Sequence, residues 1–183
     1  MGHTIAVVVG SLRKQSFNRK LAEAIANLPA ARGHEFVFVE IGDLPLYDQD
    51  DDDDQPAPVR RMKGEIEAAD GVLFVTPEYN RSVPGVLKNA IDHGSRPYGK
   101  SCWKGKPAAI AGASPGAMGT ALAQQHLRNI LSVLGMPALT LPEVFLVWKE
   151  GLVTDEGKIG EQSAEFLDIW VEAFVDHISR HKS

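Results

Sequence analysis

The chain has 183 residues, 44% of them hydrophobic and 23% charged, which is typical of a single globular domain covering residues 1–183 and excludes a disordered chain. No apolar run approaches the ~20 residues that a membrane-spanning helix requires, and one cysteine cannot form an internal disulfide, so we expect a cytoplasmic protein without a membrane partner. The net charge of −5, from 19 basic and 24 acidic side chains, argues against a nucleic-acid partner.

The N-terminal residues predict a strand, a helix and a second strand. His3–Val9 is short, β-branched and apolar without alternation, as is typical of a strand buried on both faces of a parallel sheet. Ser16–Leu28 places apolar side chains at helical spacing, and Ser16 is the expected N-cap. Phe36–Val39 predicts the second strand.

A polar stretch follows at Asp43–Pro58, with three prolines and the aspartate run Asp50–Asp54. Mutual repulsion of the carboxylates opposes compaction, so we expect a solvated, mobile loop. A helix is predicted over Val59–Ala69 and a third buried strand over Val72–Val75.

The C-terminal half alternates in the same way. Its predicted elements are a helix at Val83–Arg96, a strand at Lys106–Ala113, a helix at Met118–Leu134, a strand at Leu139–Trp148 and a helix at Glu161–His181. Ser82 is the candidate N-cap of the first of these helices, with Pro84 in its first turn.

Five strands alternating with helices indicate an α/β fold with a doubly wound parallel sheet. Among the topologies that right-handed crossovers allow, we expect the flavodoxin-like order 2-1-3-4-5. In such sheets ligands bind beyond the carboxyl ends of the strands, near the switch between strands 1 and 3. The loops after Val9, Val75 and Ala113 are therefore the places to search for a site.

The first of these loops, Gly10–Arg19, combines hydroxyl, amide and cationic side chains with the start of a predicted helix. Unpaired N–H groups and the positive end of the helix dipole suit a phosphate. Ser11, Ser16 and Asn18 can add hydrogen bonds, and Arg13 can add a bidentate charged one. The alternative interpretation is an ordinary capped helix with solvated cations. Because the loop lacks the GxGxxG pattern that accommodates a pyrophosphate, it favours the terminal monophosphate of a mononucleotide such as FMN.

The second loop, Pro77–Gly85, offers a flat side chain, Tyr79, that could cover a flavin ring. Asn80 and the loop amides could contact the edge of the ring, and a following helix N-terminus would favour negative charge there. Taken alone, the loop is equally well explained as a helix entry with a surface tyrosine. In the third loop, Gly112–Ala117, small residues leave room for a bound ring or ribose.

Four segments together resemble the NADPH-dependent FMN reductase family, a flavodoxin-like group that includes quinone, azo-dye and chromate reductases. They are Gly10–Ala22 (GSLRKQSFNRKLA), Asp43–Asp48 (DLPLYD), Pro77–Asp92 (PEYNRSVPGVLKNAID) and Gly112–Gly119 (GASPGAMG). The sequence departs from the family at His93, where many relatives have a tryptophan, at the aspartate run and in the segment Tyr98–Gly105.

The resemblance implies an FMN-dependent NAD(P)H:acceptor oxidoreductase, with NADPH or NADH as electron donor. It also implies hydride transfer to flavin N5 and then reduction of a quinone, chromate or similar acceptor by a ping-pong route. Family members are commonly homodimers or homotetramers. The implied cofactor-binding residues are Ser11, Arg13, Ser16, Phe17 and Asn18 at the phosphate, Pro77, Glu78, Tyr79 and Asn80 at the isoalloxazine, and Ser114 on the other side of the pocket. We expect no obligatory catalytic side chain, and we expect Tyr79 and Arg81 to line the face that the donor and the small-molecule acceptor use in turn.

Two other functions remain as alternatives. A flavodoxin-type electron carrier would bind FMN but would be reduced by a partner protein. A hydrolase is suggested by the GxSxG pattern at Gly112–Gly116, with His177 further along the chain, but Pro115 lacks the N–H that an oxyanion hole needs after the serine.

Further motifs predict no additional function. Gly94–Ser101 matches GxxxxGK[ST], but it follows a helix rather than a strand, so we expect no ATP site. The aspartate run lacks the glycine and glutamate of a calcium loop, and His177 and His181 have no evident third ligand, so we expect no metal. Cys102 lies beside cations that favour a lowered thiol pKa.

Overall fold

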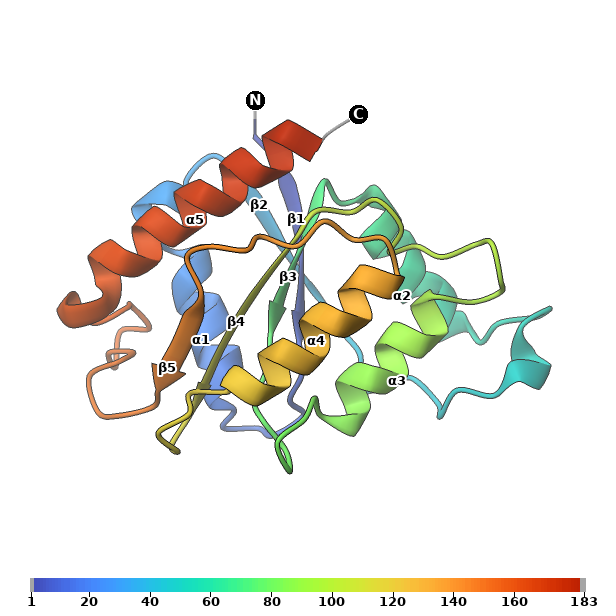
Figure 1. Cartoon of the computed structure of the whole chain (residues 1–183), viewed down its shortest axis with the longest axis horizontal. Helices are drawn as coiled ribbons and strands as arrows, with labels where there is room; N and C mark the ends of the chain where they lie inside the picture. The colour runs from blue at the N-terminus through green and yellow to red at the C-terminus, as the bar shows by residue number, and fades with distance from the viewer. Residues whose placement is uncertain (1, 182–183) are drawn as a thin grey trace.

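The computed structural model describes residues 2–181, and its five strands form one parallel sheet in the order β2-β1-β3-β4-β5 (Figure 1). The predicted fold class and strand order are therefore confirmed. The strands are β1 (Thr4–Val9), β2 (Glu35–Val39), β3 (Gly71–Val75), β4 (Ala108–Ser114) and β5 (Val144–Val147). The helices are α1 (Phe17–Ala26), α2 (Ala57–Ala68), α3 (Gly85–Gly94), α4 (Ala121–Val133) and α5 (Glu161–His181), with short 3-10 turns η1 (Pro29–Ala31) and η2 (Gln49–Asp51).

Helices cover both faces of the sheet, so successive side chains of each central strand enter two different cores. Ile5, Val7 and Val9 of β1 pack in the core beneath α1 and α5. Ala6 and Val8 of the same strand pack in the core beneath α2, α3 and α4. All five of these β1 side chains are buried, and this explains the apolar run without alternation.

The first and third helices begin differently from each other. Ser16 caps α1 as expected, because its Oγ accepts a hydrogen bond from the backbone N–H of Arg19 at 3.1 Å. Pro84 occupies the N-cap position of α3 without a side-chain hydrogen bond, so the predictions of Ser82 as N-cap and of Pro84 in the first turn are both wrong. The backbone N–H and C=O of Ser82 instead pair with those of Tyr79, and this pairing holds Ser82 in a hairpin before the helix.

The fifth strand is shorter than the prediction of Leu139–Trp148, because regular pairing with β4 covers only Val144–Val147. Ala138 makes an isolated bridge with Ala108, and the ladder is interrupted between the two stretches. Pro142 lies in the interruption and has no N–H to contribute to a ladder.

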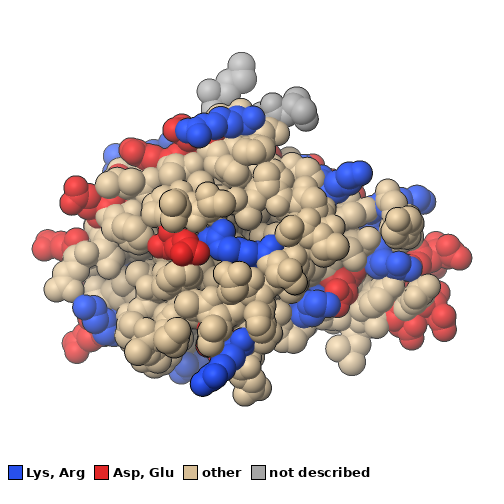
Figure 2. Space-filling model, in the orientation of Figure 1, with Lys and Arg blue, Asp and Glu red and all other residues tan. Residues whose placement is uncertain are grey.

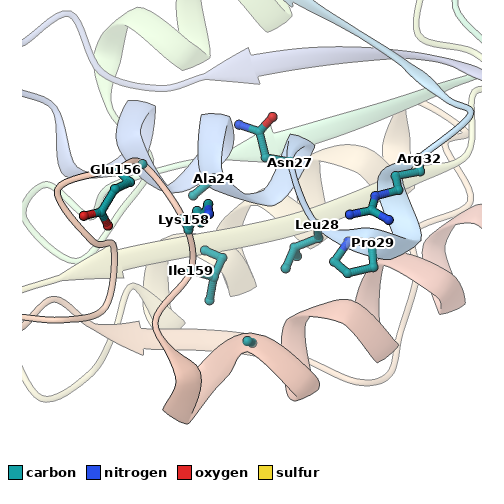
Figure 3. A pocket seen from close by; sticks show the side chains of 10 residues that line it. Ala24, Asn27, Leu28, Pro29, Arg32, Glu156, Lys158 and Ile159 are labelled. Carbon is teal, nitrogen blue, oxygen red and sulfur yellow. The ribbon is translucent and has the colours of Figure 1, made fainter.

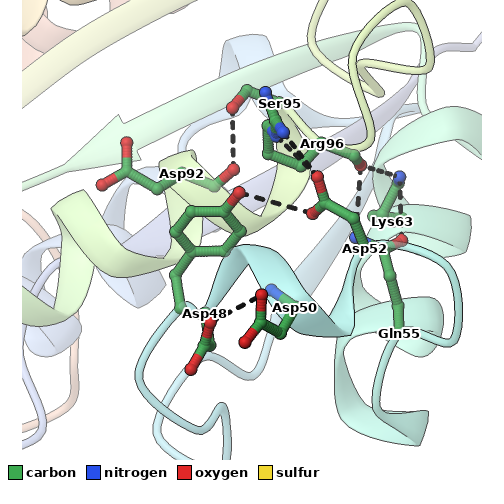
Figure 4. Close-up of polar contacts among 9 residues, drawn as sticks. Asp48, Asp50, Asp52, Gln55, Lys63, Asp92, Ser95 and Arg96 are labelled. Atoms are coloured by element: carbon green, nitrogen blue, oxygen red, sulfur yellow. Dashed lines mark hydrogen bonds and ion pairs between the residues drawn. The ribbon is translucent and has the colours of Figure 1, made fainter.

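The acidic loop is more ordered than expected. Its carboxylates gather at the edge of the molecule from which η2 projects (Figures 1 and 2). Asp48 accepts a hydrogen bond from the N–H of Asp50 at 3.0 Å and so caps η2. The side chain of Asp52 is only 13% exposed, and its Oδ2 lies 2.6 Å from a guanidinium nitrogen of Arg96 (Figure 4). Part of the loop is thus tied to the end of α3, and the expectation of a wholly solvated loop is wrong.

His93 also fastens this region. Its side chain is buried, and its Nε2 donates a hydrogen bond to the carbonyl of Pro45 at 2.9 Å. The ring of Tyr47 meets the His93 ring edge-on, with 5.4 Å between the centroids. The histidine that departs from the family pattern therefore anchors the segment before η2.

Residues 2–181 contain neither a helix suited to cross a membrane nor a cluster of metal-binding side chains. None of the helices there has the length and apolar character needed to cross a bilayer. The same residues contain no group of three or more His, Cys, Asp or Glu side chains that could hold a metal ion.

Candidate functional site

A cavity of about 210 Å³ lies where β1, β3 and β4 end, and all three predicted loops contribute to it. Its lining residues are Ser11, Arg13, Ser16, Phe17, Asn18, Pro77, Glu78, Tyr79, Ala113, Ser114 and Pro115. The structure thus brings together every predicted cofactor-binding residue except Asn80, which lies at the tip of the adjoining hairpin with Arg81. Ala113 and Pro115 were not predicted, although they flank Ser114 in the third loop.

The first loop, which connects β1 to α1, packs closely against Thr76 and α3 at Gly10. The N–H of Gly10 continues the sheet by donating to the carbonyl of Val75 at 2.9 Å. A Cβ at Gly10 would lie 2.9 Å from Oγ1 of Thr76, so only glycine fits between the strands and α3 without displacement. This packing sets the position at which α1 presents its N-terminus to the cavity.

Three side chains, Arg13, Phe17 and Trp148, stack on one another beside the first loop. The guanidinium carbon of the exposed Arg13 lies 5.0 Å from the centroid of the Phe17 ring. Phe17 in turn stacks on Trp148, with 4.4 Å between centroids and 16° between planes. Sequence reasoning missed Trp148, because nothing in the sequence links the residue after β5 to the start of α1. The stack restricts the Arg13 side chain at the edge of the cavity.

Asn18 joins α1 to the end of β4. Its side-chain amide donates to the carbonyl of Ala113 and accepts from the N–H of the same residue, both at 2.9 Å and both buried. These bonds use both the oxygen and the nitrogen of the side chain. The geometry therefore gives Asn18 a positioning role between the first and third loops rather than a free amide for a phosphate.

Glu78 has a comparable role in the second loop. Its Oε2 accepts hydrogen bonds from the backbone N–H groups of Leu122 and Ala123, each at 3.0 Å, at the start of α4. Thr120 precedes this helix but makes no side-chain capping bond, so Glu78 supplies the cap. One carboxylate oxygen of Glu78 is thus engaged at the start of α4, which gives this side chain a positioning role.

Residues Tyr79–Ser82 form a two-residue hairpin beside the cavity. The N–H of Tyr79 donates to the carbonyl of Ser82, and the reverse bond has the same length of 3.0 Å. The two residues at the tip, Asn80 and Arg81, have φ of 51° and 60°. Positive φ at both central positions is the type I′ conformation that matches the twist of a hairpin. It places Tyr79, which is 51% exposed, at the mouth of the cavity.

The third loop supports the cavity but not a nucleophilic serine. Ser114 Oγ donates to the carbonyl of Gly116 at 3.2 Å. His177 donates to the carbonyl of Pro137 at 2.8 Å, which engages the histidine that a hydrolase would require. These partners and the missing N–H of Pro115 oppose the hydrolase alternative.

The residues of this cavity fit a ligand with a phosphate at one end and a flat ring at the other. The α1 N-terminus and Arg13 provide unpaired N–H donors and positive charge. Pro77 and Tyr79 provide apolar and aromatic surface for a ring. Ligand pockets are commonly about 300–1,000 Å³, so this smaller cavity would enclose a mononucleotide only in part.

A larger cavity of about 550 Å³ lies elsewhere, between the C-terminal end of α1, η1 and residues 156–159 (Figure 3). Its cations, Arg32 and Lys158, are accompanied by the carboxylate of Glu156 and by the negative end of the α1 dipole. These opposing charges select neither a cation nor an anion, and the cavity is separate from the three loop ends.

The remaining sequence motifs have structural roles. Gly94 ends α3 and the next regular element is β4, so the GxxxxGK[ST] segment does not connect a strand to a helix. Cys102 is 3% exposed, and burial raises the pKa of its thiol to about 12. The expected lowering of this pKa is therefore wrong, because desolvation outweighs the nearby cations.

Comparison with known proteins identifies similar chains. Residues 3–150 match the model of the family described as NADPH-dependent FMN reductase. A quinone reductase from Pseudomonas putida is 47% identical over 182 residues, covering 99% of this chain and 97% of that protein. A 2-hydroxy-1,4-benzoquinone reductase from Burkholderia sp is 50% identical over 175 residues, covering 95% of each chain. The solved structure of the flavoenzyme NAD(P)H:(acceptor) oxidoreductase FerB from Paracoccus denitrificans superposes with a TM-score of 0.94 at 48% identity, covering 99% of this chain and 100% of that one.

Proposed function

The chain belongs to the NADPH-dependent FMN reductase family, and from this membership and the cavity we propose that it is a quinone-reducing NAD(P)H:acceptor oxidoreductase. It is accordingly an enzyme with FMN as cofactor and NAD(P)H as electron donor. When bound, FMN supplies the redox chemistry, taking two electrons from NAD(P)H and returning them to an acceptor. The observation that carries the proposal is the convergence of the three loops in one partly open cavity at the carboxyl edge of β1, β3 and β4.

The first loop would hold the phosphate of FMN. Ser11 and Ser16 lie in the cavity wall at the N-terminus of α1, and Arg13 lies at its edge. Ser16 Oγ already accepts from Arg19 N, and its hydroxyl hydrogen remains available to donate to a phosphate oxygen. Phe17 contributes through its backbone N–H at the first helical turn and through its stack with Trp148.

The second and third loops would hold the ring. Pro77, Tyr79 and the backbone of Asn80 are proposed to contact the isoalloxazine, with Ser114 on the other side of the pocket. Glu78 and Asn18 act by positioning, because hydrogen bonds to the protein backbone engage their side chains. No side chain is required as an obligatory acid or base.

The donor and the acceptor would use the same surface in turn. Tyr79 and Arg81 are exposed beside the partly open cavity, and the Arg81 cation suits the phosphates of NADPH. One shared surface predicts a ping-pong route, with a quinone as acceptor and chromate as a second candidate.

Steady-state kinetics test this route. With NADPH and 1,4-benzoquinone varied together, we expect parallel lines in a double-reciprocal plot, whereas intersecting lines would show that both substrates bind at once. NADPH oxidation without any partner protein separates the enzyme from the electron-carrier alternative. Substitution of chromate for the quinone in the same assay tests the second acceptor.

Two broader expectations accompany the proposal. Apolar side chains are exposed on α4 and in the segment that leads through β5, namely Val133, Leu141, Phe145 and Val147. This exposed apolar surface favours a homodimer or homotetramer, which light scattering can test. The organisation as one domain and the cytoplasmic location remain predictions.

A further inference from the structure

The hairpin Tyr79–Ser82 has a backbone that its own sequence does not favour. Type I′ turns prefer Asn-Gly or Gly-Gly at the tip, and here the second tip residue is Arg81. A bulky residue with positive φ is a conformational outlier that persists only where surrounding structure enforces it. The surroundings of the hairpin therefore have to supply the constraint.

Helix α4 contacts both sides of the hairpin. On one side, Glu78 accepts from two backbone N–H groups in the first turn of α4. On the other side, Ser82 Oγ lies 2.9 Å from Nδ1 of His126, one turn further along the same helix. The strained tip, which is part of the loop that joins β3 to α3 (Figure 1), is thus held between two attachments to one rigid element, α4.

We propose that His126 is a positioning residue that acts through Ser82, fixing the hairpin so that Tyr79 and Arg81 form a rigid surface for the donor and the acceptor. This inference rests on the proposed function, which assigns that surface to the two substrates. His126 does not line the cavity. A serine hydroxyl can donate to a neutral imidazole or accept from a charged one, so the bond does not depend on a single protonation state of His126.

The first test is His126→Phe, which keeps a ring on α4 but removes the nitrogen that bonds Ser82. A hydrogen bond of ordinary net strength corresponds to about a fivefold change in an equilibrium. We therefore expect the KM values for NADPH and quinone each to rise about fivefold, with kcat within about twofold of the wild type. Because Tyr79 and Asn80 are also proposed to contact the isoalloxazine, both proteins are assayed with FMN well above its Kd, so that the change in KM reports the substrate surface alone. A wild-type KM for both substrates would overturn the proposal.

Three further variants separate positioning from a general loss of structure. His126→Asn can replace Nδ1 with an amide group and should restore most of the KM. Ser82→Ala should reproduce His126→Phe, and the double variant should be no worse than either, since both remove one bond. Gln125→Ala changes an exposed neighbour on α4 and should have no effect. Additive losses in the double variant would contradict a shared bond.

Amide hydrogen exchange provides a readout that does not depend on turnover. The N–H groups of Tyr79 and Ser82 close the hairpin, so their exchange in His126→Phe should be about fivefold faster than in the wild type. Exchange unchanged from the wild type would refute the tether even if the enzyme were inactive. If the wild-type protein neither binds FMN nor oxidises NADPH, the proposed function fails, while this exchange result still decides the tether.

Discussion

Replacing Arg13 with alanine should weaken FMN binding through loss of a charge-assisted contact with the phosphate. The guanidinium lies over Phe17, which stacks on Trp148, so the side chain is already restricted before a ligand arrives. Less conformational entropy is then lost on binding. Charge-assisted hydrogen bonds contribute about 1.5–3 kcal/mol, and the exposure of Arg13 favours the lower end. At about 1.5 kcal/mol, the Kd for FMN should rise about tenfold.

The assay is a titration of apoprotein with FMN, followed by flavin fluorescence. Riboflavin lacks the phosphate, so its affinity should be the same for Arg13→Ala and the wild type. Lys14→Ala removes a neighbouring exposed cation and should change the Kd less than about threefold, because only diffuse attraction is lost. Arg13→Lys keeps the charge without the bidentate geometry and should be intermediate. Equal FMN affinity in Arg13→Ala and the wild type, or an equal loss for riboflavin, would refute the reasoning.

Three other predictions concern the supports of the site. Asn18→Ala leaves the buried N–H and C=O of Ala113 without their partner, so the free energy of unfolding measured by urea denaturation should fall by about 2–4 kcal/mol. An unchanged free energy of unfolding would contradict the stabilising role of these two hydrogen bonds. Glu78→Ala removes the cap of α4 and should cost about 1 kcal/mol in the same assay while FMN affinity stays within about twofold; a larger loss of affinity would show that the carboxylate itself meets the ligand. Cys102, with its thiol pKa raised by burial from 9.0 to about 12, should react with a thiol reagent at pH 8 about 1,000 times more slowly in the native than in the urea-unfolded chain. Comparable reactivity of the native and the unfolded chain would contradict the burial of the Cys102 thiol. The thiol of the unfolded chain loses its proton at lower pH than the thiol of the native chain, so Cys102 should also make the free energy of unfolding fall as pH rises from 9 towards 12.

The sheet could be predicted because burial on both faces leaves a direct mark on the sequence. All residues of Ile5–Val9 in β1 and of Gly71–Val75 in β3 are buried, and both segments are continuous apolar runs, whereas the edge strand β2 is only partly buried. The shortened β5 was harder to anticipate. The run Leu139–Trp148 is largely apolar, but register with β4 exists only after Pro142, and sequence alone does not reveal where pairing resumes.

The members of the site were predictable from the strand ends, but their individual roles were not. Loops at the carboxyl edge of a parallel sheet converge by topology, which places Ser11, Pro77 and Ser114 around one cavity. The partners of Glu78 lie 44 and 45 residues away, and such long-range bonds leave no mark on local spacing. The hairpin was missed because Arg81 replaces the glycine that usually signals a type I′ turn.

The central claim is that the first loop binds the phosphate of FMN and thereby places a reducible ring beside the hairpin. The most direct measurement is an anaerobic absorbance spectrum of the purified protein, before and after addition of NADPH, with the bound molecule identified by mass. The account predicts a yellow protein containing FMN whose flavin absorbance is bleached by NADPH without any partner protein. A colourless protein that does not take up added FMN would contradict it.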